Sequence, residues 1–92
     1  MPEDVPKEFY DAVDRFVDLA NELSRSENVS RVSSVIMYAA ARYNAHCMLT
    51  LDPDVGKNLV AAIDYFVKQY RAMLEENTGQ LLKERGSAPG VA

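Results

Sequence analysis

The chain has little of what most enzymes and metalloproteins depend on. Its 92 residues include one cysteine, one histidine, no tryptophan, and only four glycines and four prolines. A single cysteine excludes an internal disulfide and favours a reducing compartment such as the cytoplasm. The glycines are scattered singly, so the sequence has no glycine-rich phosphate loop. One histidine and one cysteine are too few for a zinc-type ligand set, so we expect no metal and no cofactor.

Positive charge and long apolar runs are also scarce. Ten Lys and Arg face 14 Asp and Glu, and the net charge of −4 disfavours nucleic acid and anionic membranes as partners. The longest apolar region is interrupted by Arg42, Asn44 and His46, whereas a membrane span needs about 18 uninterrupted apolar residues. The acidic, proline-containing N-terminus does not resemble a signal peptide. We therefore expect neither nucleic acid nor a membrane as a partner.

Apolar residues recur at helical spacing in three segments, without strand-like alternation. We predict helices over residues 6–24 and 30–51, joined by a connector in which Asn28 or Ser30 can act as N-cap. The first and third segments each carry a stripe in which spacings of four and three residues alternate. These stripes consist of Phe9, Val13, Phe16, Ala20 and Leu23 in the first segment, and of Leu59, Ile63, Phe66, Tyr70 and Met73 in the third.

The third predicted helix begins at Asp52-Pro53-Asp54, because aspartate is a good N-cap and proline fits the first helical turn. We expect this helix to end at Thr78-Gly79, since glycine tolerates the left-handed conformation common at helix ends. Residues 1–79 would then form the domain, and residues 80–92 would form a flexible tail. Three amphipathic segments with short connectors predict an all-α, antiparallel three-helix bundle.

The second predicted helix carries almost no charge. Only Arg31 and Arg42 are charged between residues 30 and 51, and a helix that is apolar nearly all round is a central or interface helix. Its main face carries apolar residues, and its far side carries small residues and methionines, which suit close helix approach and adaptable packing. We predict that this far side dimerises. The candidate interface consists of Ser34, Met37, Ala41, Ala45 and Met48. The alternative is a solvent-facing surface whose alanines only favour helix formation.

Arg42 is the one charge in the middle of the second predicted helix. Pairing with a carboxylate or with backbone carbonyls is the ordinary expectation for such a residue. Anion binding is the sharper alternative, because the guanidinium fork fits a carboxylate or a phosphate. A small-anion binding protein or an enzyme of this kind would use Arg42, Tyr43, Asn44 and His46.

Two further groups of residues have simple structural explanations. His46 and Cys47 are adjacent, so they point about 100° apart on a helix, and no third group orients them as a catalytic pair. Asp14, Asp18 and Glu22 recur every four residues and could meet a cation or a basic partner, but a solvated helix face is the simpler reading. We predict no catalytic residue.

Three blocks of sequence carry a family resemblance. They are Phe-Val-Asp-Leu-Ala-Asn-Glu at 16–22, Tyr-Ala-Ala-Ala-Arg-Tyr-Asn-Ala at 38–45, and Tyr-Phe-Val-Lys-Gln-Tyr at 65–70 with Met-Leu-Glu-Glu-Asn at 73–77. The chain resembles a family of small proteobacterial proteins that form a domain of unknown function. The resemblance implies a single small bacterial domain and transfers no catalytic residue. Its distinctive polar positions are candidates for contacts between helices or for a shallow site. These positions are Asn21, Arg42, Asn44 and Asn77.

The sequence alone therefore predicts no reaction. Our leading hypothesis is a non-catalytic, cytoplasmic interaction or regulatory protein that forms a homodimer through its second helix and can also meet an unidentified protein partner. The rival hypothesis is the small-anion binding protein or enzyme described above.

Overall fold

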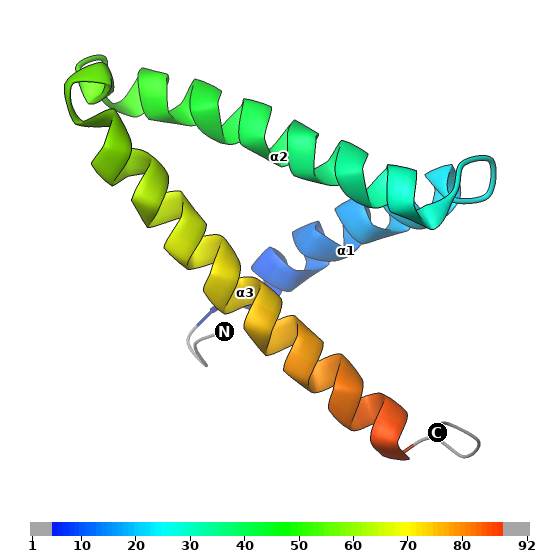
Figure 1. Cartoon of the computed structure of the whole chain (residues 1–92). Coiled ribbons are helices and arrows are strands. Elements are labelled where there is room, and N and C mark those ends of the chain that lie inside the picture. The colour runs from blue at the N-terminus through cyan, green and yellow to red at the C-terminus, as the bar shows by residue number, and fades with distance from the viewer. Residues whose placement is uncertain (1–4, 88–92) are drawn as a thin grey trace. The chain divides into compact units, whose positions relative to one another are not determined.

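The structure is a computed structural model that describes residues 5–87. Within this part of the chain it contains three α-helices, one short 3-10 helix and no strand. The helices are α1 (Lys7–Leu23), α2 (Val29–Leu51), η1 (Val55–Asn58) and α3 (Leu59–Ser87) (Figure 1). The predicted all-α fold with three main helices is confirmed. The chain divides into two compact units, one holding α1 and α2 and the other holding η1 and α3.

The ends of α1 and α2 follow from local hydrogen bonding. α1 begins after Pro6, whose carbonyl accepts a hydrogen bond from the Phe9 amide at 3.0 Å, and it is closed by Ser24. α2 begins after Asn28, whose side-chain oxygen accepts the Arg31 amide at 2.7 Å. Asn28 is thus the N-cap, one of the two residues expected. Both helices begin and end within one residue of their predicted bounds.

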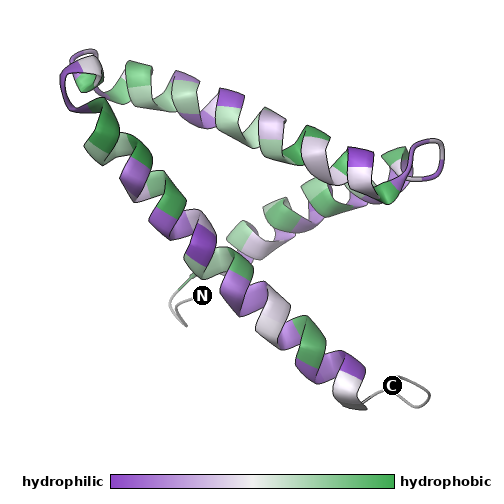
Figure 2. Ribbon diagram, in the orientation of Figure 1, coloured by the Kyte–Doolittle hydropathy of each residue, from purple (hydrophilic) through white to green (hydrophobic). Residues whose placement is uncertain are grey.

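α1 and α2 contact each other and bury Val32, which is 5% exposed. Figure 2 shows hydrophobic residues along one side of α1 and hydrophilic residues along the other. Coverage of the apolar side is incomplete, because Phe9 and Val13 keep 41% of their surface exposed and Phe16 keeps 75%. This two-helix unit therefore holds a small core at Val32 and leaves much of its apolar surface open.

The start of the third helix differs from the prediction. Asp52 is the C-cap of α2 and donates its amide to the Met48 carbonyl at 3.0 Å, so it does not cap the helix that follows. The chain instead forms the 3-10 turn η1, in which the Lys57 amide donates to the Asp54 carbonyl at 3.0 Å. Gly56 lies in this turn, and glycine is a poor former of a regular α-helix. α3 consequently starts at Leu59.

The predicted helix end at Thr78-Gly79 is wrong, because α3 continues to Ser87. Gly79 does not adopt the left-handed conformation that a glycine stop requires. A glycine inside a helix costs only about 1 kcal/mol. The residues after it, from Gln80 to Arg85, are all strong helix formers and outweigh that cost. Of the predicted tail, residues 80–87 are helical and residues 88–92 lie outside the described part. The domain boundary at residue 79 stays a prediction.

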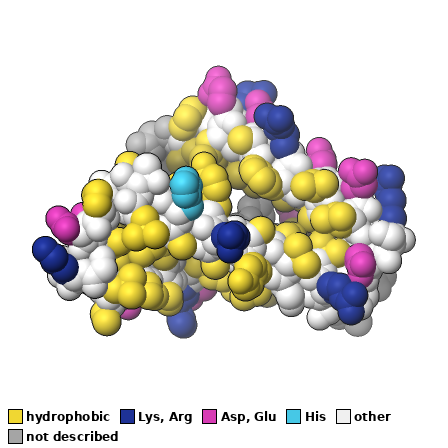
Figure 3. Space-filling view, turned by 90° about the horizontal axis from the view of Figure 1, so that it is seen from above, with side chains coloured by type: hydrophobic (Ala, Val, Ile, Leu, Met, Phe, Trp, Pro, Cys, Tyr) yellow, Lys and Arg dark blue, Asp and Glu magenta, His cyan; other side chains and the backbone are white. Residues whose placement is uncertain are grey.

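Few side chains are fully covered. Among the described residues only Val32 and Val55, at 5% and 7% exposure, are buried. Hydrophobic side chains occupy much of the surface seen in Figure 3. Large apolar residues in solvent are unfavourable by roughly 25 cal/mol per Å². Neither unit by itself encloses its apolar stripes, so the surfaces that carry them are the natural candidates for contacts.

Candidate functional site

The predicted interface residues lie on one side of α2. At about 100° per residue they fall within an arc of about 80°. Met37 is 56% exposed and Met48 is half-buried. Ser34 donates its hydroxyl to the Ser30 carbonyl at 3.2 Å, so its polar group is satisfied within the helix. We call this set the α2 stripe. It consists of Ser34, Met37, Ala41, Ala45 and Met48.

The charge on α2 is positive only. No Asp or Glu lies between Val29 and Leu51. Arg31 pairs with Glu27 through its Nη1 at 3.3 Å from the carboxylate Oε2. Arg42 makes no ion pair with any residue in the described range. The carboxylate partner expected for Arg42 is therefore absent among the described residues. Arg42 is exposed, so water can solvate its guanidinium group without such a partner.

The predicted polar positions lie on more than one side of α2, and one of them lies on α1. Arg42 and His46 are four residues apart on the same flank, and the Tyr43 and His46 ring centroids are 6.4 Å apart with a tilt of 47°. Asn44 is half-buried and lies two residues from each of them, about 160–200° round the helix. Asn21 is exposed near the end of α1, where its carbonyl accepts the Ser24 hydroxyl at 2.8 Å. The structure thus places Tyr43 beside His46, with Arg42 one turn before His46, and Asn44 on another side of α2.

Asn77, the fourth distinctive polar position of the family resemblance, lies on α3. Its side-chain Nδ2 donates to the Met73 carbonyl at 2.8 Å, one turn earlier on the same helix. This contact is local, and it leaves the amide oxygen available for another partner. A contact between helices through Asn77 stays a prediction.

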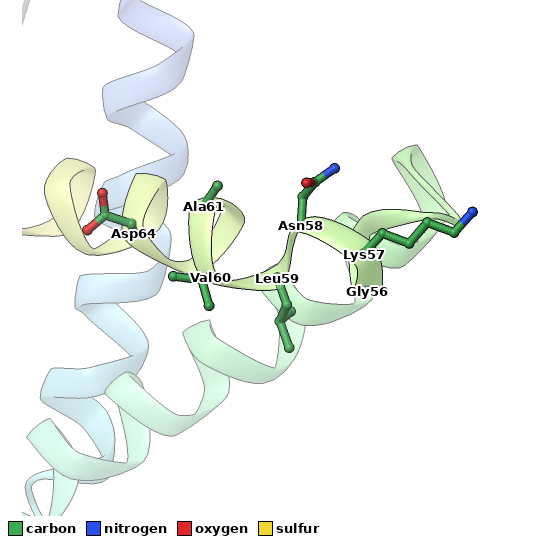
Figure 4. A pocket seen from close by; sticks show the side chains of 7 residues that line it. All are labelled: Gly56, Lys57, Asn58, Leu59, Val60, Ala61 and Asp64. Atoms are coloured by element: carbon green, nitrogen blue, oxygen red, sulfur yellow. The ribbon is translucent and has the colours of Figure 1, made fainter.

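A hollow that the sequence did not predict lies at the junction of η1 and α3. Its volume is about 480 Å³, and its lining residues come from one continuous stretch, Gly56–Ala61, with Asp64. Figure 4 shows the Lys57 and Asp64 side chains extending in different directions. Lys57 is 3.8 Å from Asp54, and Asp64 forms an ion pair with Lys68 at 2.9 Å. The hollow therefore carries no convergent set of polar groups. The only sequence signal for this hollow is the presence of Pro53 and Gly56 before α3.

Groups that could support metal or thiol chemistry are dispersed. Across residues 5–87 no three His, Cys, Asp or Glu side chains come close enough to hold a metal ion. Cys47 is a half-buried free thiol. None of the described helices is long and apolar enough to cross a membrane.

The acidic residues of α1 are exposed. Asp11 forms an ion pair with Lys7 at 2.9 Å. Asp14, Asp18 and Glu22 make no ion pair with another described residue. They lie opposite the apolar stripe of α1, where charged side chains remain hydrated. This arrangement agrees with the solvated face predicted for them.

Comparison with known proteins gives one match. No curated protein and no solved structure matches the chain. A family model described as "Protein of unknown function (DUF3144)" matches residues 9–81, from the first turn of α1 to beyond Gly79 in α3. The predicted resemblance to a domain of unknown function is confirmed, and the match brings no activity, substrate or cofactor. The chain therefore belongs to the DUF3144 family of proteins of unknown function.

Proposed function

We propose that this protein is a non-catalytic helical interaction protein that forms a homodimer through the α2 stripe. The observation that carries the proposal is the composition of α2. Between Val32 and Leu51 its only charged residue is Arg42, and the stripe presents small and methionine side chains with Met37 56% exposed. Small chains gain most from extra burial, and methionine adapts well to a packed interface.

Within each protomer we propose an antiparallel three-helix bundle. Its support is the match between the stripes of α1 and α3, which share the same alternation of four- and three-residue spacings. Each stripe runs over 15 residues, from Phe9 to Leu23 and from Leu59 to Met73, and its ends are about 21 Å apart along the helix. Stripes of equal length can cover each other along their whole extent. In this arrangement α2 would meet its own chain on one side and a second copy on the other.

The homodimer is tested by Met37→Lys combined with Ala41→Glu. These substitutions put two charges into the centre of the α2 stripe without changing the net charge, and their i,i+4 spacing is compatible with a helix. We expect the native chain to have the mass of a dimer at high micromolar concentration and the variant to shift to the monomer, because removing two charges from water into an apolar interface is costly. Light scattering after size exclusion measures both masses.

A matched control carries the same two charges outside the stripe. Val29→Lys with Thr50→Glu places them at exposed positions near the two ends of α2. This control should retain the native mass. A native chain that is monomeric at every concentration, or a stripe variant that remains dimeric, would contradict the proposal.

The second candidate is a small-anion binding protein or enzyme using Arg42, Tyr43, Asn44 and His46. It is favoured by one observation, that Arg42 has no ion pair among the described residues and shares a flank with His46. A ligand at 100 times its dissociation constant stabilises a protein by about 2.7 kcal/mol. A thermal-shift panel of phosphates and carboxylates on the monomeric stripe variant separates this candidate from the first. An unchanged melting temperature across the panel counts against it.

We infer a cytoplasmic location in a bacterium. The support for the location is that the chain has one cysteine, which is an unpaired thiol in the structure. The bacterial source rests on the resemblance described above. Cell fractionation of the native host tests the location. Recovery of the protein outside the cytosolic fraction would contradict it.

A further inference from the structure

The feature that leads beyond the proposed function is the uncompensated charge of Arg42. Its two nearest neighbours on the same helical flank, one turn before and one turn after, are Tyr38 and His46. Tyr38 is 72% exposed, and neither residue can neutralise a guanidinium group as a carboxylate would. Arg31, the other cation of α2, already has Glu27 as its partner. Of the two cations of α2, Arg42 is therefore the one that stays open to an external anion among the described residues.

The α2 stripe is self-complementary about Ala41. Met37 and Ala45 lie four residues to either side of Ala41, and Ser34 and Met48 lie seven residues to either side. In an antiparallel pair of α2 helices related by a two-fold axis at Ala41, residues equally far from Ala41 lie at the same height. Met37 of one copy then meets Ala45 of the second copy, and Met48 meets Ser34. Each layer sets a large side chain against a small one, and each contact occurs twice, as in an isologous interface.

This two-fold axis also fixes where the two Arg42 side chains lie. Arg42 is one residue from the axis and about 100° round from Ala41, so it lies on the flank of α2, about 60° beyond Ala45. A two-fold axis perpendicular to both helices places the same flank of the two copies on the same side of the dimer. Packed helices have axes about 8–10 Å apart, so both guanidinium groups can reach over one groove from opposite sides. Two like charges meet there, with no carboxylate from either α2.

We propose that a compact dianion binds on this two-fold axis between the Arg42 side chains of two copies and stabilises the dimer. The ligand class is phosphate or a small dicarboxylate, because both present two charged oxygen edges that match the guanidinium fork. The site is incomplete in one protomer, since each copy supplies one arginine. This inference rests on the proposed homodimer and adds the ligand that regulates it.

The test measures the dimer dissociation constant of the full chain by sedimentation in chloride buffer, and again with inorganic phosphate or malonate at matched ionic strength. When the dianion exceeds its own dissociation constant about tenfold, the dimer dissociation constant should fall about tenfold. In Arg42→Gln the dimer should persist and the response to both anions should disappear. Arg31→Gln removes the same charge from the same flank of α2, but about 15 Å along the helix from the proposed axis, and should keep the response.

The outcomes separate the inference from the proposed function. A native dimer whose dissociation constant is the same with and without dianions overturns the inference alone. So does a response that persists in Arg42→Gln or is lost in Arg31→Gln, because it then reflects overall charge. A chain that is monomeric in every buffer overturns both proposals. If phosphate acts and malonate does not, the ligand is a phosphate rather than a dicarboxylate.

Discussion

Val32 is the side chain on which the unit of α1 and α2 depends most, because it is the only buried residue there among those described. The residue also illustrates what sequence patterns determine. Val32, Ile36 and Tyr43 have equivalent helical spacing, yet Ile36 is 47% exposed and Tyr43 is 68% exposed. Periodicity predicts that these residues share one face of the helix. It does not predict which of them a neighbouring helix buries.

Substitution of Val32→Ala should lower the free energy of unfolding by about 1.5–2.5 kcal/mol, because it removes two buried methyl groups and leaves a cavity. Val29→Ala on the same helix, where the side chain is 76% exposed, should change it by less than about 0.5 kcal/mol. Urea unfolding of both variants at one protein concentration measures the difference. Equal effects of the two substitutions would show that the core is elsewhere.

Helix ends were predictable where one local signal acts alone. The Asn28 side chain caps α2 directly, and no competing residue offers an alternative start. At the other end of α2, Asp52 can serve either as the cap of the next helix or as the last hydrogen-bonded residue of α2. In the structure Asp52 is the last hydrogen-bonded residue of α2, and the turn η1 follows it. The hollow lies beside η1. The sequence pattern could not rank two local interactions of similar strength.

The continuation of α3 through Gly79 makes a prediction about the whole element. A Cβ atom added at Gly79 meets nothing within 4 Å, and the backbone there is not left-handed. Gly79→Ala should therefore raise the free energy of unfolding by about 0.5–1 kcal/mol through lower entropy of the unfolded chain. Thermal and urea unfolding measure the change.

Two further variants control for the position. Ala72→Gly, at an exposed site of the same helix, should lower stability by a similar amount. Gly79→Pro should cost about 3 kcal/mol if the helix passes through this residue. A neutral Gly79→Pro variant, together with a destabilised Gly79→Ala variant, would restore the helix end originally predicted at this glycine.

At the scale of the whole molecule, charge distinguishes α2 from the rest of the chain. The net charge is −4, but α2 carries two arginines and no acidic residue. Copies of an acidic protein repel each other, although salt screens this repulsion beyond about 8–10 Å. α2 is the long helix that contributes none of the negative charge, and this supports the proposed approach of two copies through α2. The family match and the fold class followed from the sequence, whereas the coverage of each face did not, because it depends on packing between segments that local patterns do not encode.

The free thiol at Cys47 is a natural attachment point for a spin label, from which the distance between two α2 helices can be measured. Cys47 lies six residues from Ala41 and about 120° round from it, so a nitroxide attached there would leave the α2 stripe unobstructed. Two antiparallel α2 helices would hold their Cys47 positions roughly 20 Å apart, whereas parallel helices would hold them roughly 12 Å apart. Pulsed dipolar spectroscopy on the unmutated protein would therefore report the relative polarity of the two copies without any engineered attachment point.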